Sequence, residues 1–180
     1  MPSLADIEKQ VSEASLPPIH LWQPTHEGVM DMVIRHDGTW WHEGGEIKRD
    51  SLVRLFSTIL RREADGSYCL VTPAEKLLIS VDLAPFIATS MACFKSGVEQ
   101  VVTFETNVGD RVIADREHPV YVEFDDARNP LPFVMVRHNL PALLSRSVYY
   151  QLVDIGTEHH EDYGIWSSGV FHTLGSLNDE

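Results

Sequence analysis

Positive charge is scarce in this chain. Its 180 residues include 14 Lys or Arg against 27 Asp or Glu, which gives a formal net charge of −13 at pH 7. A surface that binds nucleic-acid polymers or anionic membranes needs a positive field, because the phosphates that it meets are negative. The charge balance therefore argues against both classes of partner. A local basic patch would still suffice to bind a small anion.

Cysteine and long apolar runs are also scarce. The two cysteines, Cys69 and Cys93, form no Cys-x-x-Cys pair, so we expect neither a disulfide framework nor a zinc or redox motif. The N-terminus lacks the basic start and apolar run of a secretion signal. The most apolar stretch, residues 77–94, is interrupted by Asp82 and Pro85 and falls short of the roughly 20 apolar residues that span a bilayer. We expect a cytoplasmic protein without a membrane span.

The common catalytic motifs are missing as well. The chain has no Gly-x-Ser-x-Gly elbow, no Gly-x-x-x-x-Gly-Lys-Ser/Thr loop and no Gly-x-Gly-x-x-Gly turn. Acid pairs such as Asp125-Asp126 lie in turn-like, solvated positions that do not suit a general acid. The sequence therefore supports no catalytic residue and no cofactor.

Two histidine-containing clusters resemble metal sites only in residue type. His36 and His42 would not face each other directly across a hairpin, and no third ligand follows at a diagnostic spacing. His159 and His160 are adjacent in a polar loop, where they cannot easily aim at one ion. We expect no metal ion at either place.

The chain does contain enough apolar sequence for a folded core. Apolar residues make up 43% and charged residues 23% of the chain, as in a globular protein of one ordinary domain or two small lobes. Apolar side chains at helical spacing follow Ser3, a candidate N-cap. They predict a short amphipathic helix over residues 3–15, ended by Pro17 and Pro18.

The stretch DGTWWHEGG, residues 37–45, predicts a β-hairpin. Asp37-Gly38 lies between two strand-like runs, and a two-residue turn of this kind needs positive φ at both positions. Trp40 and Trp41 must then face opposite sides of the sheet. One is expected in the core, while the other is exposed, packed under a loop or in contact with a ligand. Gly44-Gly45 is expected to end the strand.

Residues 50–62 carry the clearest helical pattern. From Leu52 onward, apolar residues recur at i, i+3, i+4, i+7 and i+8, which places them on one stripe. Asp50 is the expected N-cap. Arg61 and Arg62 are expected in the last turn, where positive charge suits the helix dipole.

Two strands are predicted next, over residues 67–72 and 77–83. Thr72-Pro73-Ala74-Glu75 between them matches a capping box, which predicts one helical turn. Residues 88–97 are the expected connector to a second half of the chain. We therefore divide the chain into an N-terminal lobe, residues 1–90, and a C-terminal lobe, residues 91–180.

The second half reads mainly as β-structure. Four strand-like runs at about ten-residue spacing predict an antiparallel sheet; they are residues 101–106, 111–115, 119–124 and 132–137. Residues 141–155 predict a helix that lies across this curved sheet and stops at Gly156. Residues 164–175 return as one or two short strands.

The predicted fold class is α+β, with two related small lobes that each combine antiparallel strands with a helix. A weak internal sequence similarity between the two halves supports a relation between the lobes. MVIRH at residues 32–36 and VMVRH at residues 134–138 each precede an amphipathic helix with a central arginine, Arg54 or Arg146. Duplication is therefore a hypothesis.

Five of the 14 basic residues fall within fifteen positions, namely Lys48, Arg49, Arg54, Arg61 and Arg62. Lys48 and Arg49 lie at a predicted helix start, where free N–H groups already favour an anion and arginine can hold a phosphate with two hydrogen bonds. The alternative is a solvated helix face with ordinary end charges. Arg61 and Arg62 are expected to be of that kind.

Residues 37–86 resemble a bacterial protein family named only as a domain of unknown function. The resemblance rests on Gly-Thr-Trp, His-Glu-Gly, the Leu-Val-x-Leu-Phe helix and Leu-Val-Thr-Pro-x-Glu-Lys, and it extends to residues 136–154. It implies a duplicated core and a C-terminal half like pleckstrin homology domains. It also implies no established enzymatic activity, and a nucleotide-like ligand between the two halves with a role in signal transduction.

Together these observations predict a non-catalytic protein that binds a nucleotide-like, anionic small molecule in a cleft between its lobes. The candidate ligand-binding residues supply stacking surfaces and phosphate donors; they are Trp40, Trp41, His42, Lys48, Arg49, Arg54, Arg137 and Arg146. The alternative is a protein-interaction adaptor that presents its C-terminal sheet and helix to a partner peptide.

Overall fold

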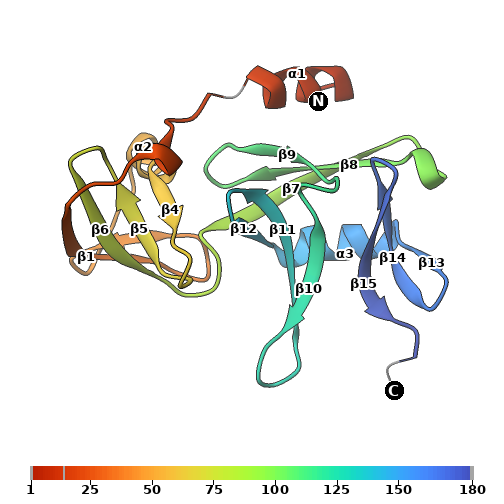
Figure 1. The fold of residues 1–180 in the computed structure, drawn as a ribbon. Coiled ribbons are helices and arrows are strands. Elements are labelled where there is room, and N and C mark those ends of the chain that lie inside the picture. The colour runs from red at the N-terminus through yellow and green to blue at the C-terminus, as the bar shows by residue number, and fades with distance from the viewer. Residues whose placement is uncertain (1, 14, 179–180) are drawn as a thin grey trace.

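The computed structural model describes residues 2–13 and 15–178. Within them the chain forms two six-stranded mixed β-sheets, each accompanied by an α-helix, and a third sheet of three strands (Figure 1). The α+β class is confirmed. The two large sheets are mixed rather than purely antiparallel, because each contains one parallel pair of strands. None of the helices in the described residues is both long and apolar enough to cross a membrane.

The elements follow one another in three groups. The first sheet comprises β1 (His26–Ile34), β2 (Trp40–His42), β3 (Gly45–Glu46), β4 (Leu60–Arg62), β5 (Tyr68–Val71) and β6 (Glu75–Val81), with helix α2 (Asp50–Thr58). The second comprises β7 (Phe86–Phe94), β8 (Val101–Thr106), β9 (Arg111–Ile113), β10 (Val120–Phe124), β11 (Pro130–Arg137) and β12 (Leu140–Leu144), followed by α3 (Arg146–Asp154). The third comprises β13 (Thr157–His159), β14 (Asp162–Ser167) and β15 (Val170–Ser176). Outside the sheets lie α1 (Leu4–Glu13), η1 (Ile19–Leu21) and η2 (Gly97–Glu99).

Both large sheets have the same strand order. The first runs β3-β2-β1-β6-β5-β4, and the second, read from its other edge, runs β9-β8-β7-β12-β11-β10. In each sheet two antiparallel three-stranded meanders meet at a parallel central pair. The helices differ in place, since α2 joins the two meanders of its sheet and α3 follows the last strand of its own. Hydrophobic alternation specifies which face of a strand is buried but not the direction of its partner, so the parallel pairs are not visible in the sequence.

The helix predicted over residues 50–62 is shorter than expected. α2 ends at Thr58, and Arg49 rather than Asp50 is its N-cap, without a side-chain hydrogen bond. Leu55, predicted on the buried stripe, is 59% exposed. Phe56, predicted on the same stripe, does pack against the core and stacks on Trp40, with ring centroids 6.3 Å apart.

Arg61 and Arg62 lie in strand β4 and not in the last turn of the helix. They pair with Cys69 and Tyr68 of β5, and Asp65-Gly66 forms the turn of this hairpin. Pairing with β5 satisfies the backbone groups of these residues, so it overrides a helical pattern that is only local.

Two further segments differ from the prediction. Residues 88–97, the expected connector, belong largely to β7, which pairs with β8 on one side and β12 on the other. The helix predicted over residues 141–155 begins as strand β12, and α3 starts only at Arg146. Ser145 is the N-cap, and its Oγ accepts a hydrogen bond from the Val148 amide at 3.3 Å. Pairing with β8 along most of its length, and with β12 at Phe86 to Ala88, determines the conformation of β7 although its two alanines have weak strand preference.

The Asp37-Gly38 hairpin is confirmed, with a longer turn than predicted. Arg35 N donates to the Thr39 carbonyl and Gly38 N donates to the Arg35 carbonyl, each at 2.9 Å. Only Gly38 has positive φ, at 84°. The Asp37 carboxylate instead accepts hydrogen bonds from the Thr39 amide and hydroxyl.

Two other turns also differ in kind. Glu43 and Gly44, both with positive φ, form a tight turn that leads from β2 into β3, so the strand reverses there rather than ends. Thr72 to Glu75 form the β5–β6 turn and not a helical turn. The Thr72 hydroxyl does accept a hydrogen bond from the Glu75 amide at 3.2 Å, as in a capping box.

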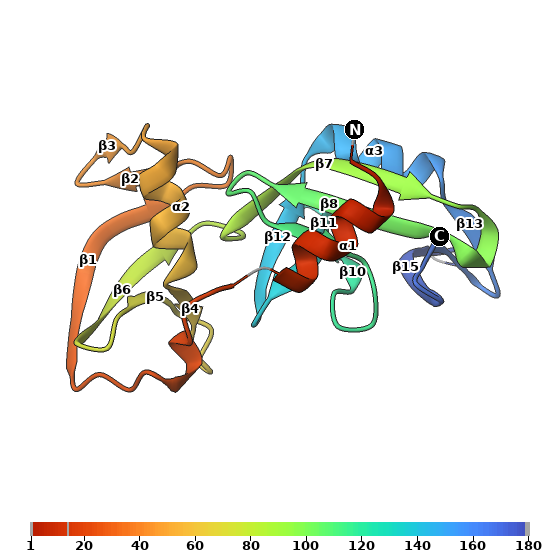
Figure 2. The same ribbon diagram turned by 90° about the horizontal axis from the view of Figure 1, so that it is seen from above.

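Helix α1 is confirmed, but it packs on the second sheet. Ser3 and Asp6 cap it through reciprocal hydrogen bonds between side chains and amides. Figure 2 shows α1 lying across the strands of the C-terminal half, and Ile7 is buried beside Met91 and Phe104. Its apolar stripe requires a partner, but the spacing of the stripe does not say which sheet provides it.

The chain passes from the first sheet to the second over residues 82–85. Strand β7 therefore lies wholly in the second sheet, although the expected boundary at residue 90 divides it. The hairpin of β14 and β15 supplies the strands predicted over residues 164–175.

One apolar core runs through both halves, and polar contacts close the seam between them. At one end, Asn107 in the β8–β9 turn donates from Nδ2 to the Gly38 carbonyl at 3.2 Å. Its amide and side chain also bond to the backbone of Ile87. A Cβ at Gly38 would lie 2.7 Å from Ile87 Cγ1 and 2.9 Å from Asn107 Nδ2. Gly38 thus permits both the turn and the close approach of the lobes.

In the middle of the seam, the Arg137 side chain is 11% exposed. Its Nη2 donates to the Ser57 carbonyl near the end of α2 at 3.0 Å. The same atom lies 3.3 Å from Asp110 Oδ2, an ion pair without hydrogen-bond geometry, and the guanidinium carbon lies 5.2 Å from the centre of the Phe86 ring. Burial raises the pKa of Asp110, and the charge of Arg137 opposes that rise.

The close approach at Gly38 can be tested against a second glycine of similar φ. Gly44 has φ 79°, and nothing lies within 4 Å of the position that a Cβ would take there. We expect Gly44→Ala to lose about 1–2 kcal/mol in free energy of unfolding, the cost of a left-handed alanine. Gly38→Ala should lose about 1–3 kcal/mol more, because its methyl overpacks the seam. Urea denaturation of both variants measures this, and equal losses would contradict the close approach.

The ion pair at Arg137 predicts a stability loss that depends on pH. Arg137→Met should lower the free energy of unfolding by about 3–5 kcal/mol at neutral pH, because it leaves Asp110 buried without its partner. Removing Arg137 raises the pKa of Asp110 further. A raised carboxyl pKa favours the folded state below the unfolded value of about 3.9, and this contribution is lost as pH rises through the folded value.

The deficit of Arg137→Met should therefore be smaller in mild acid than at neutral pH. Denaturation curves at both pH values measure it. Asp110→Asn added to Arg137→Met is the matched control, and it should recover part of the loss and flatten its pH dependence. A deficit that is the same with and without the Asp110 carboxylate would contradict the role of the pair.

Candidate functional site

A hollow of about 460 Å³ lies at the end of the seam where α2 begins. The N-terminal lobe contributes Thr39, Lys48 and Asp50 to its wall, and the C-terminal lobe contributes Asn107. The size falls within the range of small-molecule sites, which are commonly about 300–1,000 Å³. Asn107 was not predicted as a site residue; its only signal in the sequence is its place in an Asn-Val-Gly-Asp turn.

The two tryptophans have different environments. Trp40 is 1% exposed, stacks on Phe56 and contributes to the hollow only from below, so its ring offers no free face. Trp41 lies on the opposite face of the strand and is half-buried. The Arg35 guanidinium carbon lies 3.7 Å from the centre of the Trp41 indole, and Trp41 Nε1 donates to the Thr39 hydroxyl at 2.8 Å. One face of Trp41 is therefore already covered by a cation.

Three of the expected cations lie along α2. Lys48 is in the wall of the hollow, and Arg49 is exposed as the N-cap, where the first amides of the helix point outward. Arg54 is exposed one turn further on. Its guanidinium lies close to Gly109, since a Cβ there would be 3.8 Å from Arg54 Cζ. Lys48 shares the hollow with Asn107 and Arg54 lies beside Gly109, so these two side chains lie at the seam, whereas Arg49 is not part of the wall of the hollow among the described residues.

The other expected residues lie elsewhere or are already engaged. Arg137 is buried against Ser57 and Asp110, so it fastens the lobes together. His42 is exposed at the end of β2, 4.0 Å from the Glu43 carboxylate. Arg146 is exposed at the start of α3, and among the described residues it is not part of the wall of the hollow.

The electrostatic character of the hollow is mixed. Its wall contains the carboxylates of Asp37, Glu46 and Asp50 beside Lys48. Hydrogen bonds from the Thr39 hydroxyl and amide hold the pKa of Asp37 below its ordinary value, so Asp37 is an acceptor at neutral pH. A ligand held here would meet both acceptors for hydroxyl or amino groups and a cationic rim.

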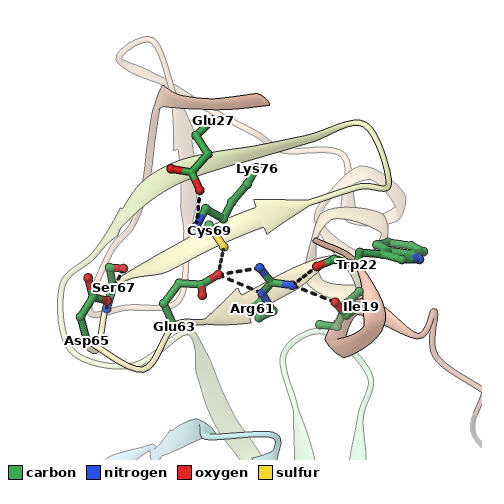
Figure 3. A network of polar contacts seen from close by, with 9 residues as sticks. All are labelled: Ile19, Trp22, Glu27, Arg61, Glu63, Asp65, Ser67, Cys69 and Lys76. Carbon is green, nitrogen blue, oxygen red and sulfur yellow. Dashed lines mark hydrogen bonds and ion pairs between the residues drawn. The ribbon is translucent and has the colours of Figure 1, made fainter. Parts of the chain in front are cut away.

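A second polar cluster lies on the outer side of the first sheet (Figure 3). Arg61 bonds to the Glu63 carboxylate at 2.8 and 2.9 Å, and its Nη1 donates to the carbonyls of Ile19 and Trp22. Arg61 was expected to be a solvated end charge. The sequence did not reveal its backbone contacts, because Ile19 and Trp22 lie about forty positions away in the chain. Arg61 instead fixes the segment that carries η1 against the sheet.

Cys69 completes this cluster. Its thiol donates to Glu63 Oε1 at 3.2 Å. Burial, together with the Glu63 carboxylate, raises the pKa of Cys69 to about 12. Burial alone would raise the pKa of Glu63, but hydrogen bonds from Cys69 and Arg61 outweigh it and lower that pKa. The thiol is therefore protonated at neutral pH, and the arrangement does not activate a nucleophile.

In the part of the chain that the structure describes, no group of three or more His, Cys, Asp or Glu side chains is arranged to hold a metal ion. His159 and His160 have ring centroids 4.1 Å apart, and His159 packs against Trp166 and Phe171. Aromatic packing accounts for the position of His159.

Comparisons with known proteins give one consistent result. Residues 17–84 match the N-terminal domain, and residues 85–174 the C-terminal domain, of a family described as a domain or protein of unknown function, DUF1285. The chain is 40% identical to a DUF1285 family protein from Silicibacter pomeroyi DSS-3, with a TM-score of 0.87 over 98% of this chain and 97% of that one.

A DUF1285 family protein from Shewanella baltica OS155 is 22% identical, with a TM-score of 0.53 over 70% of this chain and 92% of that one, which shows a likeness of fold. No curated protein matches. The resemblance to a family of unknown function is confirmed by the two domain matches and by the 40% identity over nearly the whole chain: this protein belongs to the DUF1285 family.

Proposed function

We propose that this protein is a non-catalytic ligand-binding protein that holds a nucleotide-like, anionic small molecule at the seam between its lobes. The observation that carries the proposal is the hollow at the start of α2, to which both lobes contribute. Lys48 and Arg49 stand beside helix amides that are free to bind phosphate oxygens. A ligand bound across a seam also favours one arrangement of the lobes, which is how a role in signal transduction would arise.

The mixed wall fits a nucleotide better than it fits a simple anion. Asp37 and Glu46 would repel a bare phosphate, but carboxylates accept hydrogen bonds from ribose hydroxyls and base amino groups. Lys48 and Arg49 would then hold the phosphate end. Trp41 offers its uncovered face for stacking only if the ligand reaches past Thr39, so we assign it a lesser part.

A second candidate function is the protein-interaction adaptor. Tyr150 on α3 and Phe124 at the end of β10 are exposed at 60% and 63%. Exposed aromatic side chains on the C-terminal sheet and helix are the kind of anchor that a partner peptide would bury.

We also infer that the two large sheets arose by duplication, since they share a strand order with a parallel central pair. The similarity of residues 32–36 to residues 134–138 does not support this. The first segment includes the end of β1 and the second the end of β11, which are the first and the fifth strands of their sheets in chain order. The likeness of the curled second sheet and α3 to pleckstrin homology domains stays a prediction. Superposition of β1–β6 on β7–β12, and of β7–α3 on such a domain, tests both; failure of the strands to align in order would contradict them.

The ligand can be sought by thermal shift with mono-, di- and cyclic nucleotides and dinucleotide cofactors. At one hundred times its dissociation constant a ligand should stabilise the fold by about 2.7 kcal/mol, a shift of several degrees for a chain of this size. Lys48→Ala with Arg49→Ala should abolish the shift and leave the unliganded melting temperature nearly unchanged, because both side chains are exposed.

Arg146→Ala is the matched control, since it removes an exposed arginine at the start of the other helix. It should bind the ligand as the unaltered protein does. A flat response across the whole panel would contradict the proposal and favour the adaptor, as would a shift that survives the double substitution.

A further inference from the structure

A second hollow, of about 260 Å³, lies beyond the other end of α2, and four of its eight lining residues are basic. Its wall includes His20 from η1, Arg61 and Arg62 from β4, and His138 from the β11–β12 turn. No described residue is common to this wall and that of the hollow beside Lys48. In a chain with net charge −13, this wall brings together two arginines and two histidines beside one carboxylate, Glu63.

His20 and His138 face each other across the seam. Their rings are stacked, with centroids 5.8 Å apart and planes inclined by 27°. Within the described part of the chain, neither imidazole has a hydrogen bond or ion pair, so their ring nitrogens are free to donate to a ligand. Stacked rings do not aim their nitrogens at one point between them, so this pair does not resemble a metal site.

Arg62 is the arginine of this group with most of its hydrogen-bond donors unused. Its only hydrogen bond within the described residues is a long one, from Nη1 to the Asn139 carbonyl at 3.5 Å, and its guanidinium lies 5.2 Å from the centre of the Tyr68 ring. Arg61, by contrast, is neutralised by Glu63 and fastened to the backbone of Ile19. Arg61 thus positions the segment that carries His20, while Arg62 keeps most of its donors.

From these observations we propose that the hollow binds a dianion of the phosphate type, held by Arg62 and by the protonated imidazoles of His20 and His138. Histidine is the side chain that changes charge between pH 5 and 8, so the site should bind more tightly as pH falls through that range. Without an anion, two protonated rings at this separation would repel each other and loosen the contact between η1 and the β11–β12 turn. A dianion in the hollow beside the two rings would offset that repulsion and tie the lobes together.

The charged groups in the wall beside the pair are Arg61 and Arg62 of β4 and Glu63, which follows that strand. Tyr68 of β5 and Tyr121 of β10 lie near Arg62. Glu63 is occupied by Arg61 and Cys69. Burial raises the pKa of Tyr68 and Tyr121, so both are neutral between pH 5 and 8.

Inorganic sulfate is the appropriate first probe, because it remains a dianion throughout this pH range whereas phosphate itself titrates. Sulfate should raise the melting temperature at pH 5 beyond the effect of sodium chloride at equal ionic strength, and its affinity should fall about tenfold by pH 8 as charge-assisted hydrogen bonds are lost. The imidazole NMR signals of His20 and His138 should move on titration. Equal binding at both pH values, or sulfate no better than chloride, would overturn the proposal.

Three variants localise the effect. Arg62→Gln should lose sulfate binding at every pH, and Arg128→Gln, which changes an exposed arginine in the β10–β11 turn, is its matched control. His20→Gln with His138→Asn should lose the pH dependence; asparagine suits the left-handed conformation of residue 138, where φ is 42°. Binding that is unaltered in Arg62→Gln, or that keeps its pH dependence in the double variant, would overturn the assignment.

Two further measurements separate this site from the proposed nucleotide site and identify the source of the dianion. Lys48→Ala with Arg49→Ala should leave sulfate binding intact; loss of binding there would place the anion at the other hollow and overturn the proposal. A phosphate monoester such as glycerol phosphate, compared with inorganic phosphate at pH 5, distinguishes the phosphate end of a larger molecule from the free ion. Tighter binding of either supports the dianion site, and binding of neither overturns it.

Discussion

The arrangement of the two lobes depends on the buried guanidinium of Arg137. It joins the Ser57 carbonyl of α2 to Asp110 in the β8–β9 turn, so a single side chain of the second sheet holds both lobes. Burying a charge is costly unless it is paired and hydrogen-bonded, and here the partners come from different lobes. The hydrogen bond to the Ser57 carbonyl forms only when the lobes are docked, so docking stabilises the buried guanidinium.

Helix α2 is the element around which the seam is organised. Gly38 and Asn107 meet near its start, Arg54 lies beside Gly109 along its length, and Arg137 contacts it near its end. A helix of nine residues is about 13 Å long, so the two hollows at its ends are separate places. They also differ in chemistry. The wall of the hollow at the start has three carboxylates and one lysine, whereas the wall of the hollow beyond the end has two arginines, two histidines and one carboxylate.

The cluster of Arg61, Glu63 and Cys69 positions a residue of the proposed anion site, although we assign none of the three a contact with the anion. Arg61 holds the backbone of Ile19 and Trp22, which places His20 opposite His138. Glu63 neutralises Arg61, and the thiol of Cys69 remains protonated because burial raises its pKa to about 12. Arg62, one position away and on the other face of the strand, is left with donors to spare.

Local signals in the sequence were enough to predict the capped helix α1, the Asp37-Gly38 hairpin, the opposed faces of Trp40 and Trp41, and the strands β8 to β11. Turn residues, caps and the alternation of side chains act over a few positions, so they can be read without knowing the fold. The same signals placed Lys48 and Arg49 at a helix start.

The pairings between distant positions, in contrast, came from the packing of the whole chain. Strand pairing turned Leu60–Arg62 and Leu140–Leu144 from helix into strand, docking placed α1 on the second sheet, and the seam buried Arg137 while leaving Arg62 and His138 at a hollow. These outcomes depend on which surfaces meet, and no local pattern specifies the partner.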